Sequence, residues 1–158
     1  MIQVRPAIPA DVPVILRFVR ELAAFEREPD AVTATESMLA AALFGENPAA
    51  EAVLAEREGE PVGFALFFHN FSTWEGRRGL YLEDLYVTPA ARGQGAGAAL
   101  LRHLAALAVA RGCARFEWSV LDWNEDAIAF YRAMGAVGQD EWTVQRVSGD
   151  ALARLAAS

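Results

Sequence analysis

The sequence predicts a mixed α/β fold, built as a single domain over residues 1–158. Segments with the alternating pattern of strands are interleaved with segments whose apolar residues recur every three or four positions, as in amphipathic helices. No repeat, linker or low-complexity tract divides the chain. A hydrophobic content of 54% is enough for one buried core, so we expect a central sheet flanked by helices.

The first half of the chain contains signals for two helices and three strands. Val14, Ile15 and Phe18 begin an apolar stripe with helical spacing, and Pro29 limits the length of that helix. Gly59-Glu60 between two apolar segments is typical of a hairpin turn. The predicted elements are strands at 2–5, 52–58 and 61–71, a helix that begins at Ala10 or Asp11, and a helix from Thr35 to Gly45.

The second half begins with a strand and ends with a helix. Asn124 is a good N-cap, and Glu125 and Asp126 in the following turn complement the helix dipole. The predicted elements are strands at 80–87, 115–121 and 141–147, and helices from the glycine run to about Arg111, from Asn124 to Met134, and over 148–156.

Charge and composition limit the classes of partner. A net charge of −7 argues against nucleic acid and favours a cationic small molecule. The longest uncharged stretch, Pro61 to Trp74, is too short to cross a bilayer, and residues 1–13 lack the apolar core of a secretory signal. The single cysteine, Cys113, cannot form an internal disulfide. We therefore expect a soluble cytoplasmic protein that binds neither membrane nor nucleic acid.

The run from Arg92 to Gly97 has the composition of an anion-binding loop. Its three glycines allow a tight turn with accessible backbone N–H groups, and the helix that follows adds the positive end of its dipole. A Walker loop requires lysine, and all 14 basic residues of the chain are arginine. A dinucleotide fingerprint beginning at Gly93 is an alternative, with Glu117 as the ribose-binding acid. Against it, the segment from Thr88 to Arg92 separates the glycines from the preceding strand.

Several segments resemble one enzyme superfamily. The Arg-x-x-Gly-x-Gly loop after a strand, and the Asn-led helix that carries Phe130-Tyr131, resemble the GNAT superfamily of acetyl-CoA-dependent N-acetyltransferases. The similarity runs from about Arg5 to Trp142. Within the superfamily, four further segments resemble the diamine (spermidine/spermine) N-acetyltransferases and their thialysine-acetylating relatives: Glu26, 72–74, 81–84 and 120–124.

The resemblance implies a sheet that is splayed near its middle, acetyl-CoA as the donor in that splay, and a homodimer. It also implies roles for individual residues. Backbone groups that bind the pantetheine arm are expected at Leu85, Tyr86 and Val87. The remaining coenzyme-binding residues are expected to be Arg92, Gly93, Gln94, Gly95, Ala96, Gly97, Ala98, Asn124 and Ala127. The amine is expected to contact Phe25, Glu26, Glu83 and an acid near the C-terminal strand, either Asp140 or Glu141.

Acetyl transfer to an amine requires a base and an acid. An alkylammonium group has a pKa of roughly 10.4, so it must lose a proton before it attacks a thioester. Glu83 is the predicted base, with its pKa raised by burial or with a water chain carrying the proton onward. Asp84 would point to the opposite face of an ideal strand unless a bulge redirects it. Tyr131, which shares a helical stripe with Asn124, is the predicted acid that protonates the departing thiolate.

Three functional hypotheses remain open from the sequence. The first is an N-acetyltransferase in which a small-molecule amine, such as a lysine-like amino acid, diamine or polyamine, attacks acetyl-CoA directly in a ternary complex. The second is an acetyl-CoA-binding module without catalysis, and the third is a dinucleotide-dependent oxidoreductase. Cys113, His69 and His103 are interpreted as structural, and no Cys/His cluster has the spacing of metal ligands, so no metal is expected.

Overall fold

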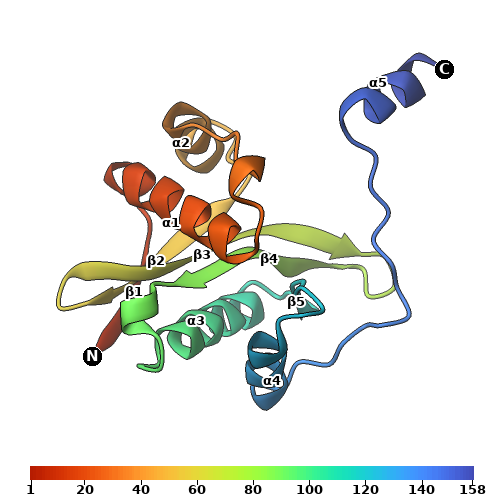
Figure 1. The fold of residues 1–158 in the computed structure, drawn as a ribbon. Coiled ribbons are helices and arrows are strands. Elements are labelled where there is room, and N and C mark those ends of the chain that lie inside the picture. Colours follow the sequence, from red (N-terminus) through yellow and green to blue (C-terminus); the bar gives the residue numbers. More distant parts are fainter. The chain divides into compact units, whose positions relative to one another are not determined.

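The computed structural model describes residues 1–158 as two compact units, residues 1–123 and residues 124–158. The first unit contains an open five-stranded sheet in the order β1-β2-β3-β4-β5 (Figure 1). Strands β1 to β4 pair antiparallel, and β5 is parallel to β4. The predicted mixed sheet is confirmed. The strands are β1 (Ile2–Pro6), β2 (Glu51–Arg57), β3 (Glu60–Ser72), β4 (Arg77–Val87) and β5 (Phe116–Glu117).

Helices cover both faces of this sheet. α1 (Val12–Phe25) and α2 (Glu36–Phe44) lie on one face, and α3 (Ala96–Ala110) lies on the other (Figure 1). Because apolar residues recur every three or four positions in α1, one stripe of the helix is buried against the sheet. The core on the α1 side consists of Ile15, Phe18, Leu43, Ala52, Leu54, Phe64 and Tyr86. None of the helices is long and apolar enough to span a membrane.

The second unit contains α4 (Glu125–Ala133) and α5 (Gly149–Ala157). The strand predicted at 141–147 is wrong, because these residues form no regular structure and lie exposed. Their alternating apolar side chains suit a strand, but a strand requires a hydrogen-bonded partner and this segment pairs with none. The strand predicted at 115–121 is likewise reduced to the two residues of β5.

The β2–β3 hairpin turns one residue earlier than predicted. Arg57 pairs with Glu60, so Glu58 and Gly59 form the two-residue turn instead of Gly59 and Glu60. Both turn residues have positive φ, 53° for Glu58 and 79° for Gly59, as a type I′ turn requires. Glu58 therefore occupies a backbone region that favours glycine.

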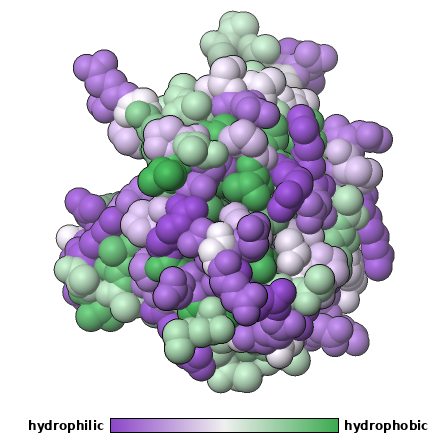
Figure 2. All heavy atoms as spheres, turned by 90° about the vertical axis from the view of Figure 1, so that its left-hand side faces the viewer, coloured by the Kyte–Doolittle hydropathy of each residue, from purple (hydrophilic) through white to green (hydrophobic).

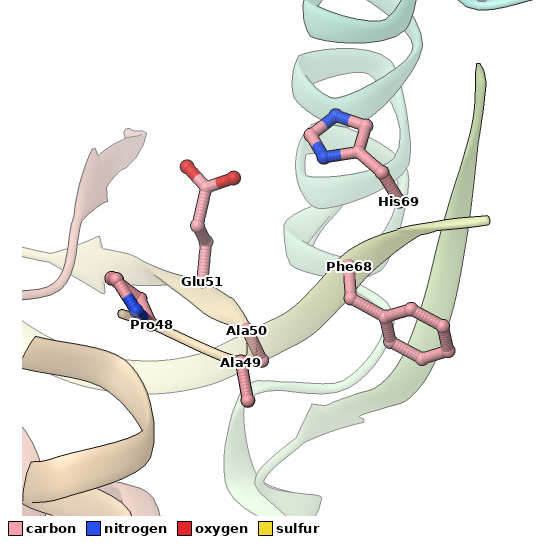
Figure 3. Close-up of a pocket in the computed structure, with 6 residues that line it drawn as sticks. All are labelled: Pro48, Ala49, Ala50, Glu51, Phe68 and His69. Carbon is pink, nitrogen blue, oxygen red and sulfur yellow. The ribbon is translucent and has the colours of Figure 1, made fainter. Parts of the chain in front are cut away.

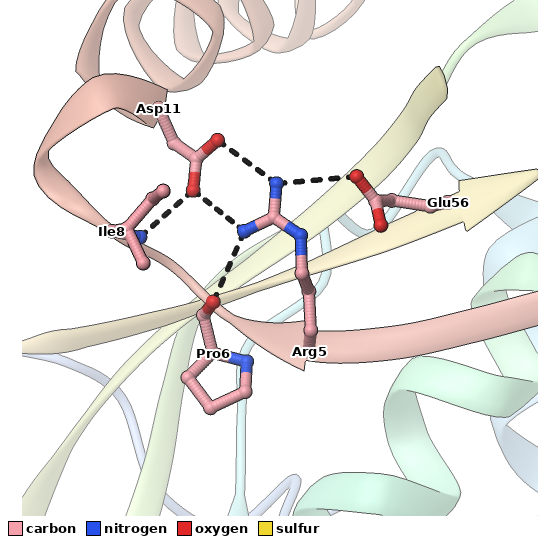
Figure 4. A network of polar contacts seen from close by, with 5 residues as sticks. All are labelled: Arg5, Pro6, Ile8, Asp11 and Glu56. Atoms are coloured by element: carbon pink, nitrogen blue, oxygen red, sulfur yellow. Dashed lines mark hydrogen bonds and ion pairs between the residues drawn. The ribbon is translucent and has the colours of Figure 1, made fainter. Parts of the chain in front are cut away.

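A buried ion pair joins β1 to the beginning of α1. The two terminal nitrogens of Arg5 donate to the carboxylate of Asp11 at 2.8 and 3.0 Å, and one of them also lies 3.1 Å from Glu56 (Figure 4). Asp11 is only 7% exposed, and it also accepts the backbone N–H of Ile8 at 2.8 Å. The hydrogen bond from Arg5 lowers the pKa of Asp11 below its ordinary value.

Every ion pair of the structure uses arginine as the cation. Besides Arg5, the cations are Arg17 with Glu21, Arg111 with Glu51, and Arg115 with Glu75.

On the face that carries the N-terminus and the β2–β3 hairpin, hydrophilic side chains surround separate small hydrophobic patches (Figure 2).

Replacing Asp11 by Asn is expected to lower the free energy of unfolding by about 1 to 3 kcal/mol at pH 7, because Arg5 loses a charged acceptor in a buried position. The folded-state pKa of Asp11 is lowered, so the carboxylate stabilises the fold above the unfolded value of 3.8 and this contribution is lost as the pH falls further. Urea unfolding from pH 7 down to pH 3 measures the difference. A difference that stays constant over this range would contradict the assigned role.

Candidate active site

The glycine loop places backbone amides around an open space. Gly93 and Gly95 have φ values of 78° and 86°, which side chains rarely tolerate. The first bond of the helix runs from the N–H of Ala99 to the carbonyl of Gly95 at 2.9 Å, so the three amides before Ala99 have no partner within α3. A Cβ added to Gly93 or Gly95 would meet no atom within 4 Å. These amides and the dipole of α3 can therefore hold a phosphate group at this turn.

Two arginines flank the glycine loop. Arg92 donates its Nε hydrogen to the carbonyl of Val87 at 3.1 Å, and its guanidinium lies 5.1 Å from the centre of the Phe25 ring. Arg57, at the end of β2, donates to the side-chain oxygen of Gln94, whose amide nitrogen in turn donates to the carbonyl of Ala90. A pyrophosphate fits this set of amides and guanidinium groups.

The sheet opens beside the second half of β4. β5 pairs with β4 only at Leu80 and Tyr81, so the segment from Leu82 to Val87 has no strand on that side. The three residues predicted to bind a pantetheine arm, Leu85, Tyr86 and Val87, lie along this free edge. Main-chain groups at a free strand edge can pair with an extended ligand.

An extra residue in β4 changes which face its side chains reach. Leu66 pairs with Asp84 and Phe67 pairs with Leu82, so Glu83 has no counterpart on β3 and forms a β-bulge. Beyond the bulge, Tyr86 packs against Phe18 of α1, with ring centres 5.7 Å apart. Asp84 lies two positions before Tyr86 and therefore points toward the α1 side. The bulge at Glu83 therefore moves the side chain of Asp84 to the face opposite the one it would reach in a regular strand.

The charges of two carboxylates, Glu83 and Glu26, act on a third, Asp84. Burial raises the pKa of Asp84 to about 6, with further contributions from the charges of Glu83 and Glu26. Burial also raises the pKa of Glu26, which stands at the end of α1. Glu83 is exposed at the bulge. The structure thus brings together Glu26 and Glu83, which the sequence predicted, with Asp84, which it did not.

The end of α1 is closed by a residue in an unusual conformation. The N–H of Glu28 bonds the carbonyl of Ala23 at 2.9 Å and the N–H of Arg27 bonds that of Ala24 at 3.1 Å, which together form a Schellman motif. Arg27 has a φ of 67° at the position where glycine is usual, at a cost of about 1 kcal/mol. Its guanidinium lies 3.9 Å from the ring centre of Trp123.

Within the second unit, α4 carries three predicted site residues. The side-chain oxygen of Asn124 accepts the N–H of Ala127 at 3.3 Å, which confirms Asn124 as the N-cap. Tyr131 lies on the same helix, and its ring centre is 5.6 Å from that of Phe130. Asp140 and Glu141 follow in the exposed segment without regular structure.

Comparison with known proteins identifies the family. The model of the acetyltransferase (GNAT) family matches residues 16–136. The chain belongs to the GNAT acetyltransferase family. This confirms the predicted N-acetyltransferase and the GNAT fold, and it decides against a dinucleotide-dependent oxidoreductase and a module without catalysis. Acetyl-CoA is the donor that enzymes of this family use.

Relatives of this GNAT acetyltransferase align over almost its whole length. A thialysine N-epsilon-acetyltransferase of Sus scrofa is 41% identical, over 97% of this chain and 96% of that protein. An L-ornithine N5-acetyltransferase of Arabidopsis thaliana is 33% identical, over 95% of this chain and 86% of that protein. The solved structure of an integron cassette protein from the V. cholerae mobile metagenome superposes with a TM-score of 0.82 at 28% identity, over 99% of this chain and 98% of the other.

The GNAT acetyltransferase also has a pocket that lies apart from the predicted site residues. Its volume is about 370 Å³, and it is lined by Pro48, Ala49, Ala50, Glu51, Phe68 and His69 (Figure 3). Arg111 holds the carboxylate of Glu51 through two hydrogen bonds of 2.7 and 2.9 Å and lowers its pKa. None of the predicted site residues lines this pocket. No group of three or more His, Cys, Asp or Glu side chains is arranged to hold a metal ion.

Replacing Asp84 by Asn is expected to stabilise the enzyme at pH 8. Because the folded-state pKa of Asp84 is raised to about 6 from an ordinary 3.8, its ionised form opposes folding above pH 6, by about 2 to 3 kcal/mol, and this penalty disappears as the pH falls to 3.8. Denaturant unfolding of wild type and variant at pH 8 and pH 4 measures both differences. Glu83→Gln, at the exposed neighbouring position, is the control, and we expect it to change stability little. An equal gain for Asp84→Asn at both pH values would contradict the burial of this charge.

Proposed function

We propose that this enzyme transfers the acetyl group of acetyl-CoA to a primary amine of a small cationic molecule: a thialysine- or lysine-like amino acid, a diamine or a polyamine. The observation that carries the proposal is the group formed by Glu26, Glu83 and Asp84 beside the free edge of β4. A cluster of carboxylates at the position where an acyl thioester would lie attracts ammonium groups. The names of the curated relatives, which include thialysine and L-ornithine acetyltransferases, support the same substrate class.

The donor would be held by the main chain over most of its length. The amides of Gly93 to Ala98 and the guanidinium of Arg92 bind the pyrophosphate, and the free edge from Leu85 to Val87 pairs with the pantetheine arm. Asn124 and Ala127, at the beginning of α4, complete the proposed coenzyme-binding set. Bound acetyl-CoA supplies an acyl group activated as a thioester.

Amine recognition would depend on the half-buried carboxylates. Asp84, with a pKa of about 6, is mostly ionised at pH 7 and becomes a better partner for an ammonium group than a fully solvated acid. Glu26 approaches from the end of α1, and its own raised pKa reflects the same partial burial. Phe25 and an acid at Asp140 or Glu141, with Glu141 preferred, remain part of the proposed amine-binding set.

Proton transfer requires a route from the amine to solvent. Glu83 is exposed at the bulge, so a proton taken from the amine, directly or through water, can pass from it to bulk water without remaining in the site. Tyr131 is the proposed acid for the departing thiolate. The reference pKa of a phenol is near 10 and that of a thiol is near 8.5, so the proton transfer has only a small free-energy cost.

We propose that residues 1–158 form one catalytic domain. The family match supports this because it continues past residue 123 into the second unit. The chain acts as a homodimer, and the exposed apolar side chains of Trp142, Val144 and Leu155 are available to a partner subunit. It binds no nucleic acid or membrane, as its net charge of −7 favours cations. It works in the cytoplasm.

Tyr131→Phe is expected to lower kcat at least about 100-fold with thialysine, lysine, ornithine and spermidine, because the departing thiolate loses its proton donor. Release of free coenzyme A thiol from acetyl-CoA measures turnover. Phe130→Tyr, at the neighbouring position of α4, is the control for changes to the helix itself. Calorimetry should show that Tyr131→Phe retains acetyl-CoA binding. Full turnover in Tyr131→Phe would exclude the acid role, and no turnover by wild type with any of the four amines would refute the proposed substrate class.

Glu26→Gln is expected to raise the KM of the amine about 10-fold while the KM of acetyl-CoA stays within about twofold, because it removes one negative charge from the amine side only. Initial rates with each substrate varied in turn separate the two constants. Glu28→Gln, two positions further along and exposed, is the matched control. Equal changes in both constants would discount Glu26 as an amine-binding residue.

A further inference from the structure

Four side chains in the first unit form a row of two adjacent aromatic rings, Phe25 and Trp123, with an arginine at each end, which we call the cation–aromatic row. Arg92 lies 5.1 Å from the ring centre of Phe25. The rings of Phe25 and Trp123 are 6.0 Å apart at an angle of 48°. The guanidinium of Arg27 lies 3.9 Å from the ring centre of Trp123, which is the shortest of the three distances. A cation is attracted to the face of an aromatic ring, and tilted aromatic pairs attract each other, so all three contacts are favourable.

Arg27 occupies a backbone position where its side chain is a disadvantage for folding. Its positive φ of 67° and the two hydrogen bonds of the Schellman motif define a site at which glycine is preferred. The contact with Trp123 is the only interaction of the Arg27 side chain in the structure. A strained residue whose sole contact is with one exposed ring points to a role for that contact beyond stability.

At the other end of the row, Arg92 directly precedes the glycines of the phosphate-binding loop. Arg92 uses its Nε hydrogen for the carbonyl of Val87, and its two terminal nitrogens form no hydrogen bond within the protein. Phe25 lies on one side of this guanidinium and Tyr86, at 5.8 Å, lies on another. Arg92 is therefore held in place while its outer donors stay available for an anion.

Trp123 lies at the junction, the point in the sequence where the first unit ends and the second begins. It is the last residue of the first unit and directly precedes Asn124, the N-cap of α4. Tyr131 follows on that helix. Asn124 is therefore the first residue after the row in the chain.

We propose that the cation–aromatic row couples the binding of the coenzyme phosphates at Arg92 to the position of the chain at Trp123, with Phe25, Trp123 and Arg27 acting as positioning residues for acetyl transfer. This inference rests on the proposed function. It assigns Phe25 a role on the coenzyme side, in addition to any contact with the amine. It also gives the side chain of Arg27 a role at a position where glycine would suit the backbone better.

The test compares Arg27→Gly with Glu58→Gly. Both replace a positive-φ residue by glycine, and Glu58 lies in the β2–β3 turn and makes no contact with the row. We expect both variants to keep or raise the thermal midpoint, because both relieve the same kind of backbone strain. Only Arg27→Gly should lower kcat, by about three- to tenfold, and weaken coenzyme A binding by a similar factor. Arg27→Lys, which keeps a cation in place, should recover part of both losses.

Two further measurements separate coupling from simple loss of structure. In calorimetry with coenzyme A, the combined Arg27→Gln and Trp123→Leu variant should lose less affinity than the sum of the single variants, because both remove the same contact. Coenzyme A titration should also change tryptophan fluorescence in wild type, and this change should be absent in Trp123→Phe. Identical kinetics and affinity for Arg27→Gly and Glu58→Gly, or additive losses in the double variant, would overturn the inference. Failure of wild-type protein to acetylate any amine would instead refute the proposed function, since coenzyme A binding is read independently.

Discussion

A single extra residue in β4 organises the two faces of the sheet. Before Glu83, Leu80 and Leu82 are buried in pairing with β3, and after it Asp84 and Tyr86 point toward α1. A regular strand would keep one set of alternate side chains on one face throughout. With the bulge, the same strand contributes apolar side chains to the core in its first half and an acid next to the free edge in its second half. The carboxylate group depends on this change of face.

Three consecutive residues at the end of α1 each contact a different part of the first unit. Phe25 reaches the guanidinium of Arg92, Glu26 influences the charge of Asp84, and Arg27 stacks on Trp123. Phe25 is the last helical residue, Glu26 is the C-cap, and Arg27 has a positive φ, so the three side chains belong to three different backbone conformations. The end of α1 thus touches the phosphate-binding loop, the carboxylates and the junction at once. A small shift of this helix would alter all three.

Local signals predicted most of the elements, and long-range contacts account for what was missed. The glycine loop and the Asn124 cap depend on neighbouring residues alone, and both were readable from the sequence. The bulge at Glu83 depends on the register with β3, which no local pattern encodes, so the position of Asp84 could be stated only conditionally. The segment 141–147 has the alternation of a strand but no partner, which shows that alternation indicates suitability for pairing and not pairing itself.

The exclusive use of arginine in the ion pairs has a chemical consequence for an enzyme that handles acetyl thioesters. Guanidinium groups stay protonated and are poor nucleophiles at neutral pH, whereas the side-chain amine of lysine reacts slowly with acyl donors. The pairs at Arg5, Arg111 and Arg115 therefore keep their charge in the presence of the donor. Within these 158 residues no lysine side chain competes with the amine substrate for acetyl groups, so acetylation of lysine side chains by the enzyme's own donor does not arise.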